Sequence, residues 1–299
     1  MPAIEVKNIS KSFGSNRAVD GVSFDVQPGE VFALLGPNGA GKTTIIRTIL
    51  DIFHPDAGQI SVLGSKMNEE KKNLIGYLPE ERGLYQEITL ERCLTFLASL
   101  KGMQPEIIKN RLNDYLEKFE LSAYRKKKVK ELSKGMQQKA QLITTLIHEP
   151  RIILADEPFS ALDPVNTQMV KDLLIEKRKN GVAIVMSTHQ MHQAEELCDR
   201  LVLISEGRVM LYGELDEIRH QFAKPEVLVK SPSPLPQPIK GVASMFIENN
   251  HTHMKLANGV TPQDVLRELV RQNVTVEEYE IAMPRLDEIF IQVVQGNQD

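Results

Sequence analysis

The stretch GPNGAGKTT (Gly36 to Thr44) follows the apolar run VFALL at residues 31–35 and precedes the helix-like TIIRTIL at residues 44–50. A glycine-rich loop between a buried strand and a helix is the setting that a phosphate-binding loop requires. The alternative, an ordinary glycine-rich turn, does not explain this placement between a strand and a helix. The stretch therefore predicts a nucleotide-binding α/β domain.

Each residue type in this loop has an expected role. The residues expected to contact the nucleotide are Gly36, Pro37, Asn38, Gly39, Ala40, Gly41, Lys42, Thr43 and Thr44. Glycines let backbone N–H groups close around the β-phosphate at a helix N-terminus. Lys42 reaches the β and γ oxygens as a point charge, and the Thr43 hydroxyl binds Mg²⁺. ATP and Mg²⁺ are the cofactors that the loop predicts.

A second apolar run, IILA at residues 152–155, ends in two carboxylates. Asp156 can hold Mg²⁺ through water, and Glu157 can orient or deprotonate the attacking water. Either carboxylate alone could be a solvated acid at the end of a strand. Both together, downstream of a phosphate loop, favour ATP hydrolysis.

The stretch ELSKGMQQK (Glu131 to Lys139) lies shortly before the acidic run. Together with the two motifs above, it resembles the signature of ABC transporter ATP-binding subunits, which begins Leu-Ser-Gly-Gly. The matches are Leu132, Ser133 and Gly135, and the departures are Lys134 and Met136. The resemblance implies that Ser133 and Gly135 grip the γ-phosphate bound to a partner subunit, so that two copies enclose two ATP molecules head to tail. A plain capped helix start is an alternative that is compatible with this role, since Ser133 suits an N-cap.

Three further marks of this family follow. Phe13 resembles the aromatic residue that stacks on adenine, with a core or hairpin phenylalanine as the alternative. The motif SALD (Ser160 to Asp163) resembles the loop that contacts the opposite subunit. His189, after VAIVMS at residues 182–187, resembles the switch histidine that contacts the γ-phosphate, although a lone histidine is more often structural. The resemblance covers residues 4 to about 220.

The stretch IGYLPEERGLY at residues 75–85 places Glu80 where this family has a glutamine. The family's glutamine binds Mg²⁺ through its amide oxygen and connects the core to the helical subdomain that touches the membrane partner. A carboxylate offers the same oxygen and is a harder Mg²⁺ ligand, although it repels the γ-phosphate when the metal is absent. Glu80 therefore indicates a variant of the metal site rather than a defect.

The pattern of elements predicts two domains. Strand-like runs alternate with helical patterns, which is typical of a largely parallel sheet, and residues 88–147 read as an inserted helical subdomain. The stretch SPSPLPQP at residues 231–238 predicts a loop or linker, and strands and helices of a small α+β domain follow it. We therefore expect an α/β P-loop NTPase core of the ABC ATPase type at 1–222 and a C-terminal accessory α+β domain at 223–299.

Composition narrows the setting in which the protein works. A formal net charge of -4 argues against a nucleic-acid partner, and no apolar run approaches a bilayer span. The thiols of Cys93 and Cys198 are expected to be reduced. By resemblance we expect a cytoplasmic chain, peripheral on the inner face of the membrane, that acts as a homodimer beneath a separately encoded permease subunit.

The expected function is ATP hydrolysis that powers an ABC transporter, with export as the expected direction because the C-terminal domain resembles that of sodium-export ATP-binding proteins. A non-transport ABC-type ATPase is the alternative. Such proteins usually carry two cassettes or a long coiled coil, and neither is present in the sequence. Two functions of the C-terminal domain are possible: it docks the chain onto a partner, or it senses a ligand and regulates the ATPase.

Overall fold

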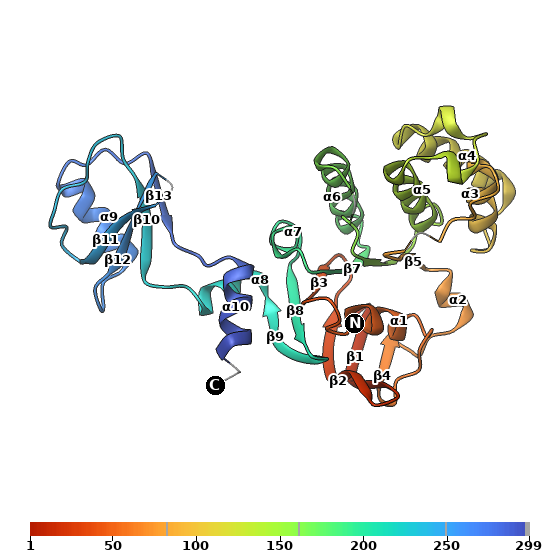
Figure 1. The fold of residues 1–299 in the computed structure, drawn as a ribbon, viewed down its shortest axis with the longest axis horizontal. Coiled ribbons are helices and arrows are strands. Elements are labelled where there is room, and N and C mark those ends of the chain that lie inside the picture. Colours follow the sequence, from red (N-terminus) through yellow and green to blue (C-terminus); the bar gives the residue numbers. More distant parts are fainter. Residues whose placement is uncertain (82, 161, 249, 297–299) are drawn as a thin grey trace. The chain divides into compact units, whose positions relative to one another are not determined.

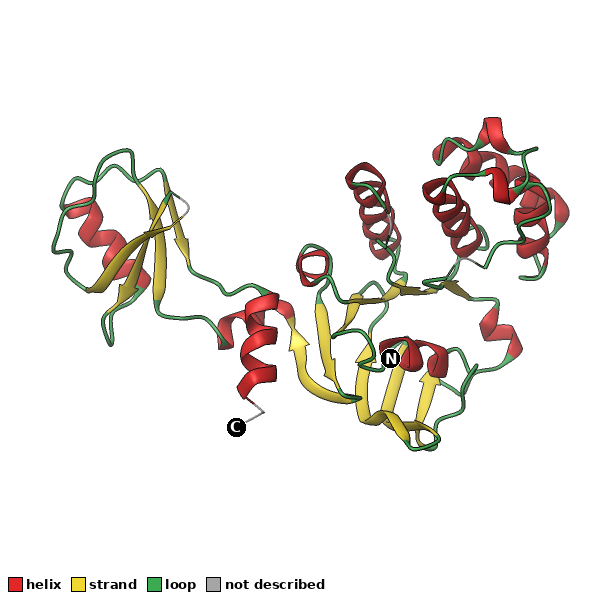
Figure 2. Cartoon of the chain, in the orientation of Figure 1, coloured by secondary structure: helices red, strands yellow, loops and turns green. Residues whose placement is uncertain are grey.

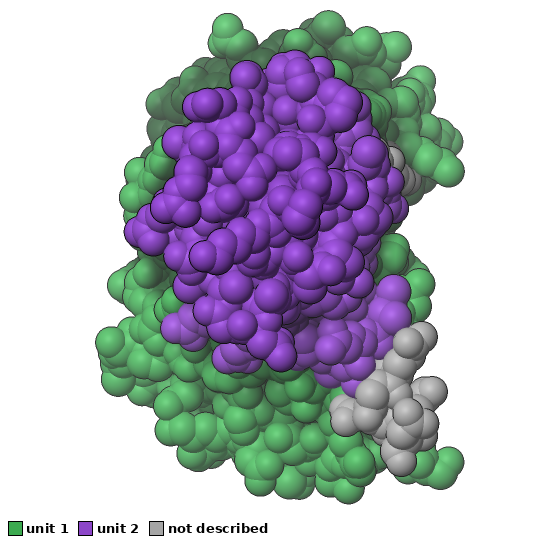
Figure 3. Space-filling model, turned by 90° about the vertical axis from the view of Figure 1, so that its left-hand side faces the viewer, with its two compact units in different colours: residues 1–215 green, residues 216–299 purple. Residues whose placement is uncertain are grey.

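The computed structural model describes residues 1–81, 83–160, 162–248 and 250–296. The chain divides into two compact units, residues 1–215 and 216–299, which are coloured separately in Figure 3. Figure 1 labels the helices and strands of both units. Within the described residues, no helix is long and apolar enough to cross a membrane.

The first unit is built on a sheet with the strand order β5-β6-β7-β3-β8-β9. Its strands are β3 (Val31–Leu35), β5 (Ile75–Leu78), β6 (Ile152–Asp156), β7 (Ala183–Thr188), β8 (Arg200–Ser205) and β9 (Arg208–Glu214). The neighbouring strands β5, β6, β7, β3 and β8 pair in parallel, in that order, and β9 pairs antiparallel with β8. Strands β3, β6 and β7 are buried along their whole length, as the continuous apolar runs predict.

A second sheet in this unit, with the order β2-β1-β4, was not predicted. Its strands are β1 (Ile4–Phe13), β2 (Asn16–Val26) and β4 (Ala57–Val62), all paired antiparallel. The pairing of β1 with β2 shifts register at several points. Such irregularities break the alternation of apolar and polar residues by which a strand is recognised in a sequence.

The described residues of this unit also form helices, some packed on strands and some on one another. They are α1 (Lys42–Ile49), α2 (Glu69–Lys72), α3 (Leu90–Ser99), α4 (Pro105–Lys118), α5 (Lys134–Leu146), α6 (Pro164–Lys179) and α7 (Met191–Glu195). Figure 2 shows α3, α4 and α5 gathered as a helical cluster within the first unit. The apolar faces of these three helices are buried, and they supply Leu94, Leu112 and Leu142 to that cluster.

The second unit packs one helix against one face of a sheet. The elements after residue 214 are α8 (Leu215–Gln221), β10 (Glu226–Lys230), β11 (Val242–Glu248), β12 (His251–Leu256), α9 (Pro262–Arg271), β13 (Glu278–Ile281) and α10 (Leu286–Gly296), and the sheet order is β11-β12-β10-β13. Thr261 caps α9 with Pro262 in its first turn, as predicted. The proline-rich stretch at 231–238 connects β10 to β11, so it is a loop inside this unit and does not separate the two units.

Candidate functional site

The predicted phosphate loop connects β3 to the N-terminus of α1. Two of its glycines are required by close backbone approach: a Cβ at Gly36 would lie 2.1 Å from the Ile204 carbonyl oxygen, and one at Gly41 would lie 2.3 Å from the Ala18 carbonyl oxygen. Both have positive φ angles, 148° and 105°. The loop conformation therefore excludes side chains at both positions.

The Lys42 ammonium is turned back onto its own loop. Its Nζ donates hydrogen bonds to the carbonyl oxygens of Gly36 (2.8 Å) and Pro37 (3.0 Å), and the residue is 6% exposed. Burial lowers the pKa of Lys42, and the nearby carboxylates of Glu157, Asp156 and Glu80 act in the opposite direction. A phosphate group would give this cation a stronger acceptor than two carbonyl oxygens.

One cavity of about 370 Å³ collects most of the predicted site residues. Its lining consists of Phe13, Asn16, Ala18, Asn38, Gly39, Gly41, Lys42, Thr43, Thr44, Glu80, Asp156 and Glu157. The lining residues come from the β1–β2 hairpin, the phosphate loop, the segment after β5 and the end of β6. The fold thus brings together segments that are more than a hundred residues apart in the sequence.

Asp156 is the last residue of β6, and only one of its two carboxylate oxygens is hydrogen-bonded. Its Oδ1 accepts a hydrogen bond from the Ser187 hydroxyl, whereas the buried Oδ2 has no hydrogen-bond partner among the described residues. A buried carboxylate oxygen without a partner is costly unless a cation or water satisfies it. The described residues hold no cluster of three or more His, Cys, Asp or Glu side chains able to ligate a metal. A carboxylate oxygen such as the unpartnered Asp156 Oδ2 is a ligand type that Mg²⁺ prefers, so it fits an ion that also takes phosphate and water ligands.

Glu157 is held by three donors at the end of β7. Its Oε1 lies 3.0 Å from the His189 backbone N–H and 2.7 Å from His189 Nδ1, and its Oε2 accepts from the Thr188 hydroxyl at 3.1 Å. Glu157 is 6% exposed and adopts a positive φ of 49°, which is uncommon for a residue with a side chain. The two predicted catalytic residues therefore lie in direct contact.

Phe13 lies at the end of β1, and it is 45% exposed. Its ring meets the Phe53 ring edge-on, with centroids 5.2 Å apart, and Lys11 Nζ lies 5.7 Å from the ring centroid. A core position, one of the alternatives for this residue, does not agree with that exposure. The hairpin alternative does agree with the structure, because Phe13 pairs with Asn16 across the β1–β2 turn, and its partly open ring lies on the wall of the cavity.

Glu80 is an exposed residue just after β5 that lines the same cavity. The buried side chain of Gln141, on α5, donates from Nε2 to the carbonyl oxygens of Pro79 (3.2 Å) and Glu81 (3.4 Å) on either side of it. These bonds tie the Glu80 segment to the helical cluster. Arg82, in the neighbouring ERGLY stretch, lies outside the described residues.

Ser133 and Gly135 do not line this cavity. Ser133 caps α5, its hydroxyl accepting from the Met136 N–H at 3.2 Å, and it is exposed. The helix-cap interpretation of Ser133 is thus confirmed. In the SALD motif, Asp163 caps α6 through the Asn166 N–H at 2.9 Å, and Ala161 lies outside the described residues.

Several residues at or beside this site were not predicted from the sequence, among them Ser187 and Thr188, whose hydroxyls donate to Asp156 and Glu157. Asn16 and Ala18 line the cavity, and Gln141 anchors the Glu80 segment. Asn16 pairs with Phe13 across the β1–β2 turn, so a hairpin prediction at residues 4–26 would have placed it beside the aromatic ring. Gln141 carries no comparable signal, because its partners are backbone carbonyls some sixty residues earlier.

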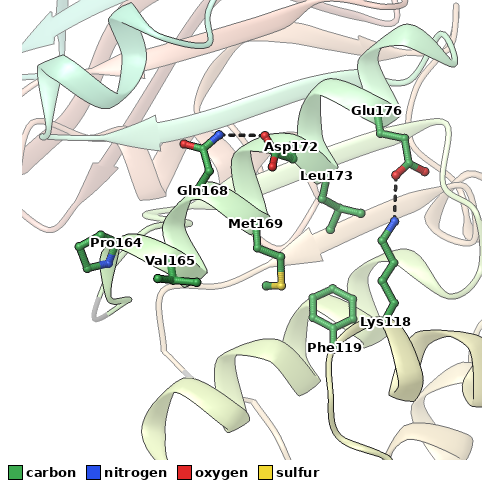
Figure 4. Close-up of a pocket in the computed structure, with 9 residues that line it drawn as sticks. All are labelled: Lys118, Phe119, Pro164, Val165, Gln168, Met169, Asp172, Leu173 and Glu176. Atoms are coloured by element: carbon green, nitrogen blue, oxygen red, sulfur yellow. Dashed lines mark hydrogen bonds and ion pairs between the residues drawn. The ribbon is translucent and has the colours of Figure 1, made fainter.

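A larger cavity of about 740 Å³ lies between the end of α4 and α6 (Figure 4). Its lining includes the apolar side chains of Phe119, Met169 and Leu173. Figure 4 shows Lys118 and Glu176 pointing toward each other across one end of it, and they form an ion pair at 2.8 Å. This cavity contains none of the predicted catalytic or nucleotide-binding residues, so size alone does not make it the candidate site.

Comparisons with known proteins agree with this geometry. The family described as "ABC transporter" matches residues 19–160, and "ATP-binding protein DrrA1-3-like, C-terminal domain" matches residues 213–294. The chain is 38% identical over 293 residues to the ABC transporter ATP-binding protein YhaQ of Bacillus subtilis (strain 168), covering 97% of this chain and 98% of that protein.

Two further proteins extend the comparison. The Nod factor export ATP-binding protein I of Rhizobium sp. (strain N33) is 38% identical over 214 residues, covering 71% of this chain and 70% of that protein. A solved structure of an ATP-binding subunit of an ABC transporter aligns with a TM-score of 0.69 and 35% identity, covering 74% of this chain and 93% of that chain.

Proposed function

This chain belongs to the family of ABC transporter ATP-binding subunits. We propose that it hydrolyses ATP in the cavity around its phosphate loop and that this hydrolysis drives an exporter. Subunits of this family bind ATP and hydrolyse it to drive transport, and this chain is such an ATPase. The observation that carries the proposed catalytic centre is that a single cavity holds Lys42, Thr43, Glu80, Asp156 and Glu157. Similarity to a Nod factor export protein supports the export direction.

The phosphate groups of ATP would be held by the loop at 36–44. When they arrive, Lys42 exchanges the carbonyl oxygens of its own loop for the β and γ oxygens, and the N–H groups at the start of α1 face the same charge. Phe13 is the proposed stacking surface for the adenine ring. Glu157 is the proposed base or orienting group for the attacking water. His189, whose Nδ1 contacts the Glu157 carboxylate, is proposed to position Glu157 and to contact the γ-phosphate.

Thr43, Glu80 and Asp156 are the proposed protein ligands of Mg²⁺, directly or through water. The unpartnered Oδ2 of Asp156 supports this set, as does the presence of all three residues in the cavity lining. Bound Mg²⁺ would neutralise charge on the β and γ oxygens.

Replacing Glu80 by glutamine should keep most of the ATPase activity and raise the Mg²⁺ concentration needed for half-maximal rate, because the oxygen remains and the charge is lost. Glu80→Ala should perform worse, since it removes the ligand altogether. A Mg²⁺ titration at fixed ATP measures both effects, and Glu81→Gln, an exposed neighbour, is the control. Overlapping titration curves for all of these proteins would remove Glu80 from the metal site.

A second ATPase subunit, with a homodimer as the simplest case, is the proposed partner across the nucleotide. Ser133 and Gly135 lie outside the chain's own cavity, and Ser133 is exposed at the N-terminus of α5. An exposed helix N-terminus favours negative charge, which suits the γ-phosphate of ATP on another chain. This arrangement leaves each active site incomplete in a single chain.

ABC ATPase subunits function with membrane permease partners, and we propose a separately encoded permease for this chain. The working location is then the cytoplasmic side of the membrane, with the chain bound peripherally through that permease. We further propose that the ATPase domain spans residues 1–222 and the accessory domain residues 223–299. The division of the chain after Leu215, a few residues earlier, supports a boundary in this region.

Membrane fractionation tests this assignment. A tagged chain expressed in its source cells should be recovered with the membranes, be released by an alkaline wash, and co-purify in mild detergent with a polytopic membrane protein.

A chain ending at Phe222 should still fold and hydrolyse MgATP, because the units have separate apolar cores. Recovery of the full chain entirely in the supernatant would contradict the permease proposal, and an unfolded or inactive truncation would contradict the boundary.

A further inference from the structure

We propose that the second unit binds a small organic anion with a flat ring, in a cavity of about 500 Å³ on the face of its sheet opposite α9. Its charged and aromatic lining residues include Lys224, Glu226, Phe246, Lys255, Arg285 and Glu288. All of them belong to residues 216–299, so this site is separate from the nucleotide cavity. Its volume lies within the range of small-molecule sites, roughly 300–1,000 Å³.

The two faces of this sheet have different chemistry. Val227, Val229 and Met254 point to the face covered by α9, where they pack with Val265 and Leu269 in the apolar core. Because side chains alternate along a strand, the residues between them point to the other face. That face carries Glu226, Leu228, His253, Lys255 and Phe246, which together line the cavity. The cavity is therefore lined by charged as well as apolar side chains and is not an extension of the core.

An aromatic platform is held in place on this face. Phe246 and His253 are cross-strand partners whose rings stack with centroids 4.6 Å apart and planes 18° apart. His253 Nδ1 lies 2.6 Å from Oε1 of Glu226, and Glu226 is 8% exposed. The hydrogen bond fixes the imidazole, and the imidazole supports the Phe246 ring, which is 42% exposed. A preorganised, partly open ring offers a stacking surface to a flat ligand.

Three cationic side chains, Lys224, Lys255 and Arg285, line the cavity, and Arg285 forms an ion pair with Asp287 at 3.5 Å. Lys255 faces Glu226 across the strands, but the Glu226 carboxylate is hydrogen-bonded to His253. In the part of the chain that the structure describes, neither Lys224 nor Lys255 forms an ion pair; Lys255 Nζ lies 5.8 Å from the centroid of the Phe246 ring. Among the described residues these two ammonium groups have no ion-pair partner, so they are suited to an anion.

These features together define the ligand class. The exposed ring of Phe246 suits a flat ring system, and Lys224 and Lys255 suit a carboxylate or sulfonate attached to that ring. Two carboxylates also line the cavity, Glu226 and Glu288, so its charge does not match a polyphosphate chain. The site therefore fits a ring-bearing compound with one or two negative charges.

Titration of the full-length chain with 2-naphthoate tests the site. The chain has no tryptophan, so the naphthyl fluorescence can be followed without indole background. We expect saturable binding of one naphthoate per chain, with neutral 2-naphthalenemethanol bound roughly tenfold or more weakly, because it lacks the charge. Saturating MgADP should not displace the naphthoate, since the two sites are separate.

Two variants of the lining locate the binding. Phe246→Ala and Lys255→Gln should each weaken naphthoate binding by about tenfold, through loss of stacking and of charge respectively. Phe246 is 42% exposed and lies outside the apolar core, so its replacement should lower Tm only slightly, through loss of the contact with His253. Ile247→Ala and Lys240→Gln are matched controls, because Ile247 is the next residue along β11 and Lys240 is an exposed lysine outside the cavity. Absence of saturable binding, equal binding of the neutral analogue, displacement by MgADP or unchanged affinity in both lining variants would overturn the proposal.

Discussion

Replacing Glu157 by glutamine should reduce the rate of ATP hydrolysis by about 10²-fold or more while ATP remains bound. The substitution keeps the size of the side chain; its amide oxygen can still accept from the His189 N–H, and its NH2 group can donate to the Thr188 hydroxyl oxygen. It removes the basic carboxylate that would orient or deprotonate water. Trapping of the ATP-bound state should then produce a dimer that elutes early in size-exclusion chromatography.

A matched control for this variant exists in the same unit. Glu206 has the same φ of 49° but is exposed and lies outside the nucleotide cavity. Glu206→Gln therefore tests the effect of losing a glutamate charge from this backbone conformation, and its turnover should equal that of the unaltered chain. A Glu157→Gln chain that hydrolyses ATP at the unaltered rate would remove Glu157 from the catalytic step.

Chains with Lys42→Ala and chains with Ser133→Arg should each be almost inactive alone, and mixing them should restore part of the activity. In a head-to-tail dimer, Lys42 and Ser133 of one chain serve different nucleotides. A mixed dimer therefore has one site with both defects and one intact site. Random mixing leaves at most about a quarter of all sites intact, which sets the ceiling for recovered ATPase activity.

The recovered activity also reports on folding. Ser133→Arg removes the N-cap of α5, a loss of about 1 kcal/mol of stability, and rescue in the mixture would show that this chain still folds. Ser122→Arg, at another exposed serine at the start of a short helix, should have little effect alone. A Ser133→Arg chain with full activity, or a mixture with none, would refute the shared-site proposal.

Much of the first unit follows from local sequence patterns. The runs that form β3, β6, β7 and β8 are continuous and apolar. Each run by itself therefore predicts a buried strand of a largely parallel sheet, without knowledge of the strands that pair with it. The phosphate loop is equally local, because strand, glycines, lysine and helix are contiguous. The sheet of β1, β2 and β4 could not be predicted in this way, because the register shifts of β1 interrupt the alternation of apolar and polar residues along the strand.

The amino-acid sequence by itself determined the ATPase core, the phosphate loop and the two carboxylates at the end of β6, because short-range patterns of polarity and backbone preference encode them. Only the tertiary structure decided which distant residues meet: His189 with Glu157, Gln141 with the Glu80 segment, and Phe246 with His253. It also decided that the proline-rich stretch is an internal loop of the second unit. These contacts depend on strand order and packing in a shared core, and the spacing of residues along a single chain carries no direct record of either.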